Sequence, residues 1–291
     1  MSTTAEAERP DLDGGDLAER YGLRKVGGRP TLRVYIRQVW ERRHFAIAFA
    51  RAKAYSGNQG SYLGQLWAIL TPLLWAALYF LVFGMLLKTD RGIDNFAAFL
   101  VTGLFVIRFI NGCMNGSAGS IDKSHNLISS LQFPRILIPM AYAGSAFINL
   151  VPALVVLFGI GLVTGEPIRW QMLLIVPTVL MAFVFATGLA FFSARLVDEV
   201  ADLNNIIPFT NRAIMYSSGV FFDLSRYGDG TAHTIMSHQP WAIFIELARV
   251  AVLGGYTVEP DIWLWALGWA VVTFATGFIF FWRAEAKYGR G

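Results

Sequence analysis

The sequence predicts an all-α integral membrane protein with six transmembrane helices, an N-terminal amphipathic interface helix, and re-entrant helices between spans five and six. Three observations predict this class. The mean hydropathy is +0.49 and 55% of the 291 residues are hydrophobic. Only 15% are charged, well below the roughly 25% of an average soluble domain. The chain contains six long apolar runs, and crossing a membrane takes about 20 apolar residues as helix.

The N-terminal region divides into two parts. Residues 1–29 are polar and have the composition of a disordered cytoplasmic tail. Residues 30–53 fit one amphipathic interface helix that begins at Pro30, because a basic helix with an apolar face can lie in the headgroup layer. Its apolar positions share one face: Leu32, Ile36, Val39 and Trp40. The helix is a structural anchor, or it also touches a cytoplasmic motor.

Residues 54–291 form the predicted six-span transmembrane domain. The apolar runs are 63–87, 96–120, 136–163, 173–194, 206–222 and 262–282. The second run contains Arg108, and the short fifth run contains Arg212. Between the last two runs, the apolar stretch 240–253 carries Glu246 and Arg249. This stretch is too short to span, so we expect a re-entrant or interfacial piece.

The distribution of basic residues predicts the orientation. Many of them precede residue 54, and Arg283, Lys287 and Arg290 follow the last run. Because lysine and arginine are retained on the cytoplasmic side, both termini are expected in the cytoplasm, as an even number of spans requires. No cleavable signal peptide is recognisable, so the first run is expected to direct insertion. The single cysteine, Cys113, excludes an internal disulfide.

Motifs for catalysis are missing from the sequence. It contains no G-x-x-x-x-G-K-[ST] phosphate loop and no serine nucleophile elbow. Its four histidines and one cysteine do not fall at the spacings of metal ligands. The sequence therefore predicts no catalytic residue and no metal site, and a chain that does not itself hydrolyse ATP.

Two segments carry more specific motifs. Residues 61–67 read SYLGQLW at the start of the first run, while 126–128 read NLI and 133–135 read FPR in the loop before the third. Together they resemble the S-x-L-G-x-x-W and N-L-I…F-P-R patterns of permease subunits of type 2 ABC transporters. Those permeases export lipid-linked O-antigen, teichoic acid and, in actinobacteria, galactan. The similarity extends over roughly residues 42–290 and is closest to the actinobacterial galactan exporter permease.

The resemblance implies a function and a set of partners. Residues 54–291 would be the permease domain of a homodimer that binds two copies of an ABC ATPase subunit. ATP and Mg would sit on that ATPase, with no cofactor on this chain and no nucleic acid. The cargo would be a lipid-linked polysaccharide, galactan or an O-antigen-like glycan on polyprenyl pyrophosphate. It would cross the bacterial plasma membrane, among whose lipids the multi-pass chain lies.

The resemblance also assigns a role to the loop of residues 122–134. In the family this loop is the coupling helix, which sits in a cleft of the ATPase and transmits its closure to the spans. The expected contact residues are Asn126, Leu127, Ile128, Phe133, Pro134 and Arg135. The alternative is an ordinary connecting turn.

A sugar polymer suits a pathway with aromatic faces, because apolar sugar faces stack on rings. The candidate pathway residues are Trp67, Trp75, Tyr79, Phe83 and Arg108. A charge in the middle of a span usually faces protein or water, so Arg108 lines the pathway or forms an interior salt bridge. Each ring has the alternative of a lipid-facing belt or the core.

Two further groups of residues complete the predicted site. Arg51, Lys53 and Ser61 are candidates for binding the lipid headgroup, with general attraction to anionic lipids as the alternative for the two basic residues. An outer gate is expected at Gly219, Phe222, Trp241 and Phe244, where Trp241 and Phe244 would bury against the second copy of the dimer.

Three competing functions remain at this point. The same machinery could export drugs or small lipids. A membrane-embedded polyprenyl-phosphate transferase would need clustered acids or metal ligands, and the one acid cluster is Asp198, Glu199 and Asp202. An ATP-independent carrier is expected to show internal repeats, which are not evident.

Overall fold

The structure is a computed structural model that describes residues 30–57, 60–87, 93–131, 133–223, 230–286 and 288. In this part of the chain every regular element is a helix, which confirms the all-α class. The predicted disordered tail, residues 1–29, lies outside the described residues.

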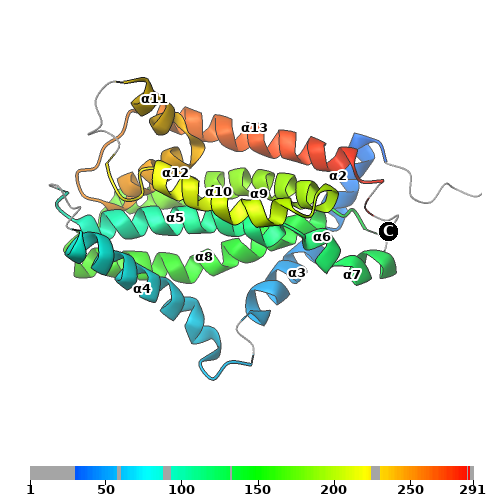
Figure 1. Cartoon of the computed structure of the whole chain (residues 1–291), viewed down its shortest axis with the longest axis horizontal. Helices are drawn as coiled ribbons and strands as arrows, with labels where there is room; N and C mark the ends of the chain where they lie inside the picture. Colours follow the sequence, from blue (N-terminus) through cyan, green and yellow to red (C-terminus); the bar gives the residue numbers. More distant parts are fainter. Residues whose placement is uncertain are drawn as a thin grey trace, which may run out of the picture.

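The long helices run along the long axis of the molecule, and α2, α6 and α7 lie at one end of the bundle (Figure 1). In chain order the elements are α2 (Leu32–Glu41), α3 (Arg43–Ser56), the 3-10 turn η1 (Gly64–Leu66), α4 (Trp67–Tyr79), the π-helical η2 (Phe80–Leu86), α5 (Phe96–Ser117), α6 (Ser120–Lys123), α7 (His125–Ser130), α8 (Leu137–Val163), the 3-10 turn η3 (Trp170–Leu174), α9 (Ile175–Glu199), α10 (Leu203–Ser217), α11 (Thr231–His238), α12 (Pro240–Val252) and α13 (Ile262–Arg283).

Five described stretches are long and apolar enough to cross a membrane: Gly64–Leu86, Phe96–Ser117, Leu137–Val163, Trp170–Glu199 and Ile262–Arg283. They correspond to five of the six predicted runs. The predicted fifth run, 206–222, is corrected: helix α10 begins and ends earlier and has 15 residues. At 1.5 Å per residue α10 is about 22 Å long, which is short of the roughly 30 Å hydrocarbon core. The chain leaves the helix at Ser218, and Gly219 follows with a φ of +73°, which favours glycine.

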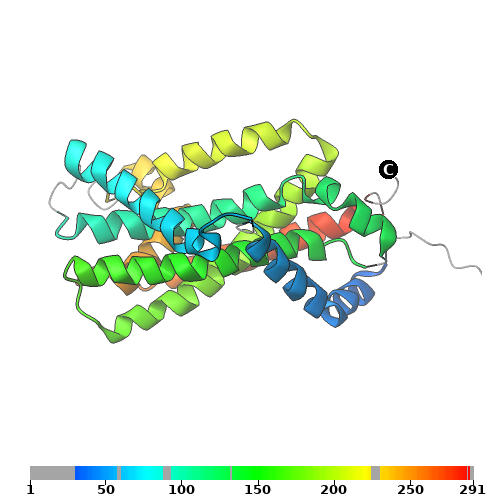
Figure 2. The ribbon, with the colours of Figure 1, turned by 90° about the horizontal axis from the view of Figure 1, so that it is seen from below.

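Helix α5 is the central element of the bundle. Of the residues in its apolar window 83% are buried, against 6% for Gly64–Leu86. Because α5 is apolar on nearly every side, it packs against α8, α9 and α12 at once. Helix α4, by contrast, stands away from the bundle at its start and reaches it at its other end (Figures 1 and 2). The space between the start of α4 and the bundle forms the candidate site.

Small residues allow two pairs of helices to approach closely. A Cβ at Gly188 of α9 would lie 2.5 Å from the carbonyl carbon of Thr273, and one at Gly277 of α13 would lie 2.5 Å from the carbonyl oxygen of Gly188. Helix α3 uses the same principle against α8, where a Cβ at Gly144 would lie 3.0 Å from the Cβ of Ala50. Close backbone contact between small residues is a common way to pack helices inside membranes.

The N-terminal amphipathic region differs from the single helix predicted over residues 30–53. It forms two helices that meet at Arg42, which leaves the helical conformation with φ −99° and ψ 14°. On the predicted apolar face, Leu32 and Val39 are partly buried, whereas Ile36 and Trp40 are exposed. The predicted apolar face is therefore split between the protein interior and the outer surface.

In the sequence, helices α11 and α12 come between α10 and α13, where the re-entrant piece was expected. Nearly every residue of α12 is buried. Gln239, just before α12, donates a hydrogen bond to the Ser217 carbonyl at the end of α10 (2.6 Å). Just after α12, the Gly254 amide donates to Glu166, which lies in the loop between α8 and α9 (2.6 Å). Helix α12 is therefore an interior element held at both ends.

The first and last described segments lie together beside α6 and α7 (Figure 1). The Tyr35 hydroxyl donates a hydrogen bond to the Glu285 carboxylate over 2.6 Å. The Trp282 indole donates another to the Pro30 carbonyl over 3.1 Å. The helix before the first span and the end of the last span thus occupy the same end of the bundle.

Candidate functional site

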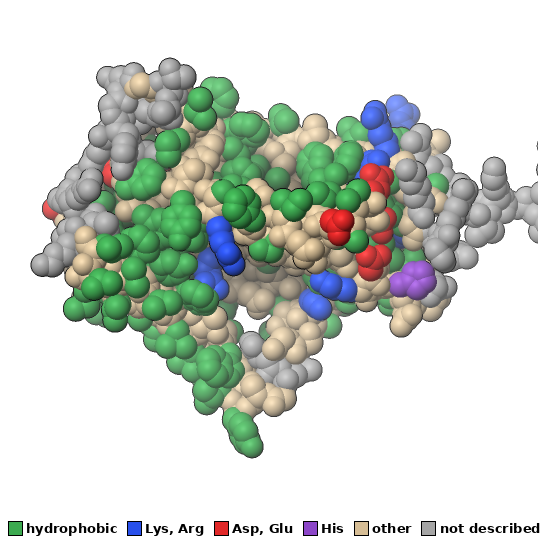
Figure 3. Space-filling view, viewed as in Figure 1, with side chains coloured by type: hydrophobic (Ala, Val, Ile, Leu, Met, Phe, Trp, Pro, Cys, Tyr) green, Lys and Arg blue, Asp and Glu red, His purple; other side chains and the backbone are tan. Residues whose placement is uncertain are grey.

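A groove of about 690 Å³ opens between the ends of α3 and α4 and the sides of α5 and α8. It exists because α4 stands away from the bundle at its start, and Figure 3 shows it as a hollow with basic side chains on both sides. Its principal lining residues are Lys53, Trp67, Thr71, Phe105, Arg108, Phe109, Lys123, Tyr142, Ser145 and Asn149.

Three cations from three different elements line this groove. Lys53 lies in the last turn of α3, Arg108 lies midway along α5, and Lys123 ends the short helix α6. None of the described lining residues is acidic. A groove with cations on its walls and apolar surface between them suits an anionic amphipathic ligand.

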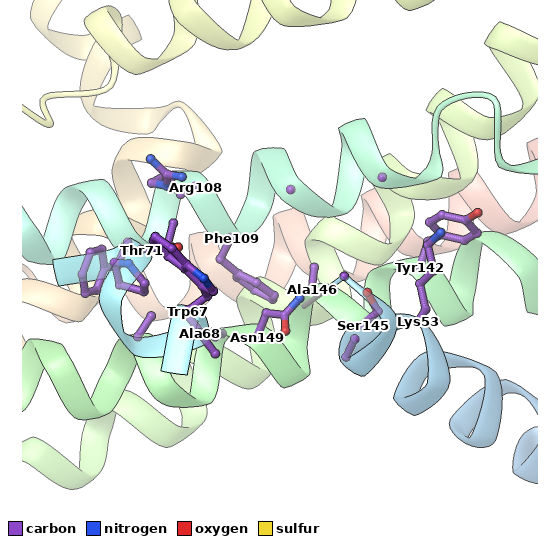
Figure 4. Close-up of a pocket in the computed structure, with 18 of the residues that line it drawn as sticks. Lys53, Trp67, Ala68, Thr71, Arg108, Phe109, Tyr142, Ser145, Ala146 and Asn149 are labelled. Atoms are coloured by element: carbon purple, nitrogen blue, oxygen red, sulfur yellow. The ribbon is translucent and has the colours of Figure 1, made fainter. Parts of the chain in front are cut away.

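Aromatic rings fix the positions of two of these cations. The Lys53 ammonium lies 4.9 Å from the centre of the Tyr142 ring, and the Arg108 guanidinium lies 4.4 Å from the centre of the Trp75 ring. Such contacts attract a cation to the ring face. Figure 4 shows Arg108 at one end of the groove and Lys53 with Tyr142 at the other. Between them lie Trp67, Phe109, Asn149 and Ser145.

Short helices α6 and α7 form the segment between α5 and α8. Asp122, His125 and Asn126 are exposed, Leu127 is partly buried, and Ile128 is buried in the core. One face of this segment therefore belongs to the bundle, and the other is exposed.

The chain that follows α7 turns inward. The Phe133 ring packs on Phe45 of α3 with a centroid distance of 4.9 Å, and Pro134 is buried. The Arg135 amide donates to the Glu285 carboxylate (2.9 Å), and the Arg135 guanidinium donates to the Glu285 carbonyl (2.5 Å). The segment of residues 133–135 is thus bound to α3 and to Glu285, which follows α13.

Glu285 is 7% exposed and accepts hydrogen bonds from two elements. Burial raises the pKa of its carboxyl, and the bonds from the Arg135 amide and the Tyr35 hydroxyl oppose that shift in part. Burial and the Glu285 charge together raise the pKa of the Tyr35 hydroxyl, so Tyr35 remains the donor.

At the opposite end of the bundle, Arg249 of α12 is fully buried. Its guanidinium donates to the carbonyls of Gly219 (2.8 Å) and Val220 (3.2 Å), just after α10, and pairs with Glu246 at 3.0 Å. The Tyr256 hydroxyl completes the group with a hydrogen bond to Glu246. Because a buried charge is costly unless it is paired and hydrogen-bonded, this network fixes the break after α10 against α12.

Comparison with known proteins decides the family. Residues 53–253 match the family model described as ABC-2 type transporter. The chain belongs to the ABC-2 type transporter family. It is 24% identical over 201 residues to the O-antigen export system permease protein RfbA of Myxococcus xanthus. The matched stretch covers 69% of this chain and 76% of that protein.

Two proteins of the same name from Klebsiella pneumoniae are also similar. They are 30% and 28% identical over 169 residues, which is 55% of this chain and 64% of each protein. The match thus spans slightly less than two thirds of the Klebsiella proteins. The relatives are named as permeases, and this chain is a membrane-spanning permease component of an ABC transporter, not an enzyme.

The structure divides the predicted pathway residues of this ABC-2 permease into two groups. Trp67 and Arg108 line the groove, and Trp75 holds the Arg108 guanidinium. Tyr79 and Phe83 lie elsewhere: their rings pack on Phe221, after α10, with centroid distances of 5.9 and 4.2 Å. They pack the end of α4 and the following η2 against the bundle.

The predicted headgroup residues of the permease also separate. Lys53 lines the groove, whereas Arg51 and Ser61 are exposed and are not among its lining residues. The sequence did not single out Lys123, which completes the basic wall. Its place in the loop between the second and third predicted runs, where Arg135 is the other basic residue, is the signal that could have identified it.

The predicted gate residues lie at the end of the permease opposite α7. Gly219 accepts the Arg249 bond, and Phe222 is partly buried directly after α10. Trp241 packs edge-on against Phe185 at 5.5 Å. Phe244 is 0% exposed and lies in the chain's own core, which differs from the expected burial against a second copy. Sequence reasoning noted Arg249 and Glu246 but missed their network.

Proposed function

We propose that this chain is the permease subunit of an ATP-driven ABC exporter that moves a lipid-linked polysaccharide across the bacterial plasma membrane. The observation that carries the proposal is the groove between α3, α4, α5 and α8, which combines three cations with aromatic, hydroxyl and amide side chains. The printed names of the relatives, which refer to O-antigen export, support the same cargo class.

The groove chemistry suits both parts of such a cargo. Lys53 and Lys123 provide positive charge for a pyrophosphate, where charge-assisted bonds are the strong ones. The rings of Trp67 and Phe109 provide faces on which sugars stack, and Asn149 offers an amide to hydroxyl groups. The glycan we propose is galactan or an O-antigen-like polymer on polyprenyl pyrophosphate.

The proposed machine contains two copies of this chain and two copies of a separate ATPase that binds ATP and Mg. Helices α6 and α7 dock to the ATPase. The homodimer is supported by the low burial of Gly64–Leu86, a span that makes few contacts within its own chain. Each copy would then contribute one groove to the translocation pathway.

The proposed topology has six crossings and cytoplasmic termini. Tyr35 precedes the first span and Glu285 follows the last, and their side chains are bonded at 2.6 Å. A chain that returns to the side where it began crosses the membrane an even number of times. If all five long helices cross, a sixth crossing is needed, and we assign it to α10, which runs along the bundle (Figure 1). The basic terminal residues favour the cytoplasm for both ends.

The test is the ATPase activity of this chain co-purified with a candidate ABC ATPase and reconstituted in vesicles. We expect lipid-linked galactan to stimulate hydrolysis and to cross into the vesicle lumen. The double variant Lys53→Gln, Lys123→Gln should need about tenfold more glycan for half stimulation, because it removes two charges from the groove. Arg33→Gln removes an exposed charge of α2 and is the matched control.

The outcomes separate the competing functions. Stimulation by a drug or short lipid and not by glycan would move the assignment to small-molecule export. A chain that binds no ATPase would contradict the proposal. It would favour an ATP-independent carrier or a polyprenyl-phosphate transferase instead. Equal responses of the double variant and the control would exclude the groove as the headgroup site.

A further inference from the structure

The segment of residues 133–135 is directed away from the surface that an ATPase would reach. Phe133 packs on Phe45 of α3, and Arg135 binds Glu285 through both its amide and its guanidinium. The exposed face of the neighbouring helices is formed instead by Asp122, His125 and Asn126. Residues 122–135 therefore have two faces: one contacts the chain's own helices, and the other is exposed.

Phe133 is the first ring in a continuous series that reaches the groove. Phe45 packs on Phe49 of the same helix at 6.0 Å, and Phe49 packs edge-on against Tyr142 of α8 at 6.2 Å. Tyr142 in turn carries the Lys53 ammonium at 4.9 Å. The series connects the loop after α7 to a cation on the groove wall without a gap.

Glu285 links the segment of residues 133–135 to α2. Its carboxylate accepts one bond from Tyr35 of α2 and one from Arg135 just before α8. Helix α2 continues into α3, and α3 is held against α8 where Ala50 meets Gly144. A displacement of the 133–135 segment must therefore also move α2 and α3, because packed interiors transmit strain.

We propose that Phe133, Arg135 and Glu285 are positioning residues that transmit movement of α7 to the Tyr142–Lys53 pair in the groove, while the exposed face of α6 and α7 contacts the ATPase. This inference rests on the proposed function, because it assumes an ATPase partner. It assigns Phe133 and Arg135 to contacts inside this chain and not to contacts with the ATPase. It also adds Glu285, Phe45 and Phe49 to the functional residues.

The experiment uses the full complex and two separate readouts. Co-purification with the ATPase measures docking, and the ratio of glycan-stimulated to basal hydrolysis measures transmission. We expect Phe133→Leu and Glu285→Ala to keep the complex and to lower that ratio about tenfold, within the range of typical coupling effects. Glu285→Gln keeps an acceptor for the Arg135 amide and should restore most of the ratio. Trp40→Leu, which removes an exposed ring from α2, is the control.

A double-mutant cycle tests the ring series itself. If Phe133 acts through Tyr142, the effect of Phe133→Leu should vanish in a Tyr142→Leu background, whereas independent sites give additive effects. The double variant His125→Ala, Asn126→Ala should no longer co-purify with the ATPase. Phe133→Leu and Glu285→Ala should still co-purify with it.

Two results would overturn the inference. One is loss of the complex in Phe133→Leu to the same degree as in the His125, Asn126 double variant, which would make Phe133 an ATPase contact. The other is an unchanged stimulation ratio in both Phe133→Leu and Glu285→Ala. Failure of the wild-type chain to bind any ATPase would instead count against the proposed function, so the two failures are distinguishable.

Discussion

Glu285 shows how one buried carboxylate can organise the end of a helical bundle. Removing a carboxylate from water is costly, and hydrogen bonds to it offset the cost only in part. Here the Tyr35 hydroxyl and the Arg135 amide are the donors, at 2.6 and 2.9 Å. The pKa of the carboxyl stays raised because burial outweighs these bonds.

The raised pKa gives a pH dependence with a definite sign. The folded state binds the Glu285 proton more tightly than the unfolded state, so this contribution to stability is fully present below the ordinary value near 4.5 and is lost as pH rises through the folded-state pKa. Glu285→Gln mimics the neutral acid. We expect the melting temperature of the variant, minus that of the wild type, to be smallest at acid pH and to grow as pH rises.

Two tyrosines near Glu285 do not titrate in this window. Burial raises the pKa of both Tyr35 and Tyr288 above their ordinary values. Melting curves in detergent between about pH 4 and pH 8 provide the measurement. A difference that stays constant over this range would mean that Glu285 keeps one protonation state throughout.

At the scale of elements, the crossing of α9 and α13 depends on having no side chain at two positions. A Cβ at Gly277 would lie 2.5 Å from the Gly188 carbonyl oxygen, so Gly277→Ala must push the helices apart. We expect a loss of about 1–3 kcal/mol, the usual cost of overpacking. Gly268→Ala on the same helix meets no atom within 4 Å and should be neutral or mildly stabilising, because alanine favours helix.

Thermal unfolding of the two variants in one detergent measures this difference. The comparison controls for the change in helix propensity, since both sites lie in α13 and receive the same methyl group. Equal melting temperatures would show that α9 and α13 can separate without cost, contrary to the packing described above.

The sequence predicted the elements whose formation depends on composition alone. Long apolar runs are sufficient for a helix of membrane-spanning length, so five of the six predicted runs correspond to such helices in the structure. The break at Arg42 and the early end of α10 at Ser217 depend on tertiary packing, which composition does not reveal. For the same reason the separation of Tyr79 from Trp67 was missed: it follows from the tilt of α4, which opens the groove at one end only.

The candidate site was predictable to a similar degree. The motif of residues 61–67 located the start of α4, and Trp67, Lys53 and Arg108 do line one groove. The contacts of Phe133 and Arg135 are with Phe45 and Glu285, which are distant in sequence. A motif identifies which residues matter, but the partner of each residue becomes visible only when the chain is folded.

For the whole molecule, the bonded pair Tyr35 and Glu285 restricts the topology. With both ends on one side, five long spans leave two possibilities: α10 provides a sixth crossing, or one of the five does not cross. The polar loop that joins α8 to α9 contacts both the start of α5 and the end of α12, through Glu166 bonds to Asn95 and Gly254. These three points must then share the side opposite to α7.

Cysteine labelling in intact cells distinguishes the two possibilities. In a Cys113→Ser background, single cysteines replace His125 in α7, Ala201 before α10 and Thr257 after α12, all of which are exposed. If α10 crosses and the termini are cytoplasmic, a membrane-impermeant maleimide labels only Thr257→Cys until the cells are opened. Labelling of Ala201→Cys together with Thr257→Cys would place both ends of α10 on one side, and one of the five long helices would then have to stay within one leaflet. The inverse pattern, with His125→Cys and Ala201→Cys labelled first, would keep six crossings and reverse the orientation that the basic termini predict.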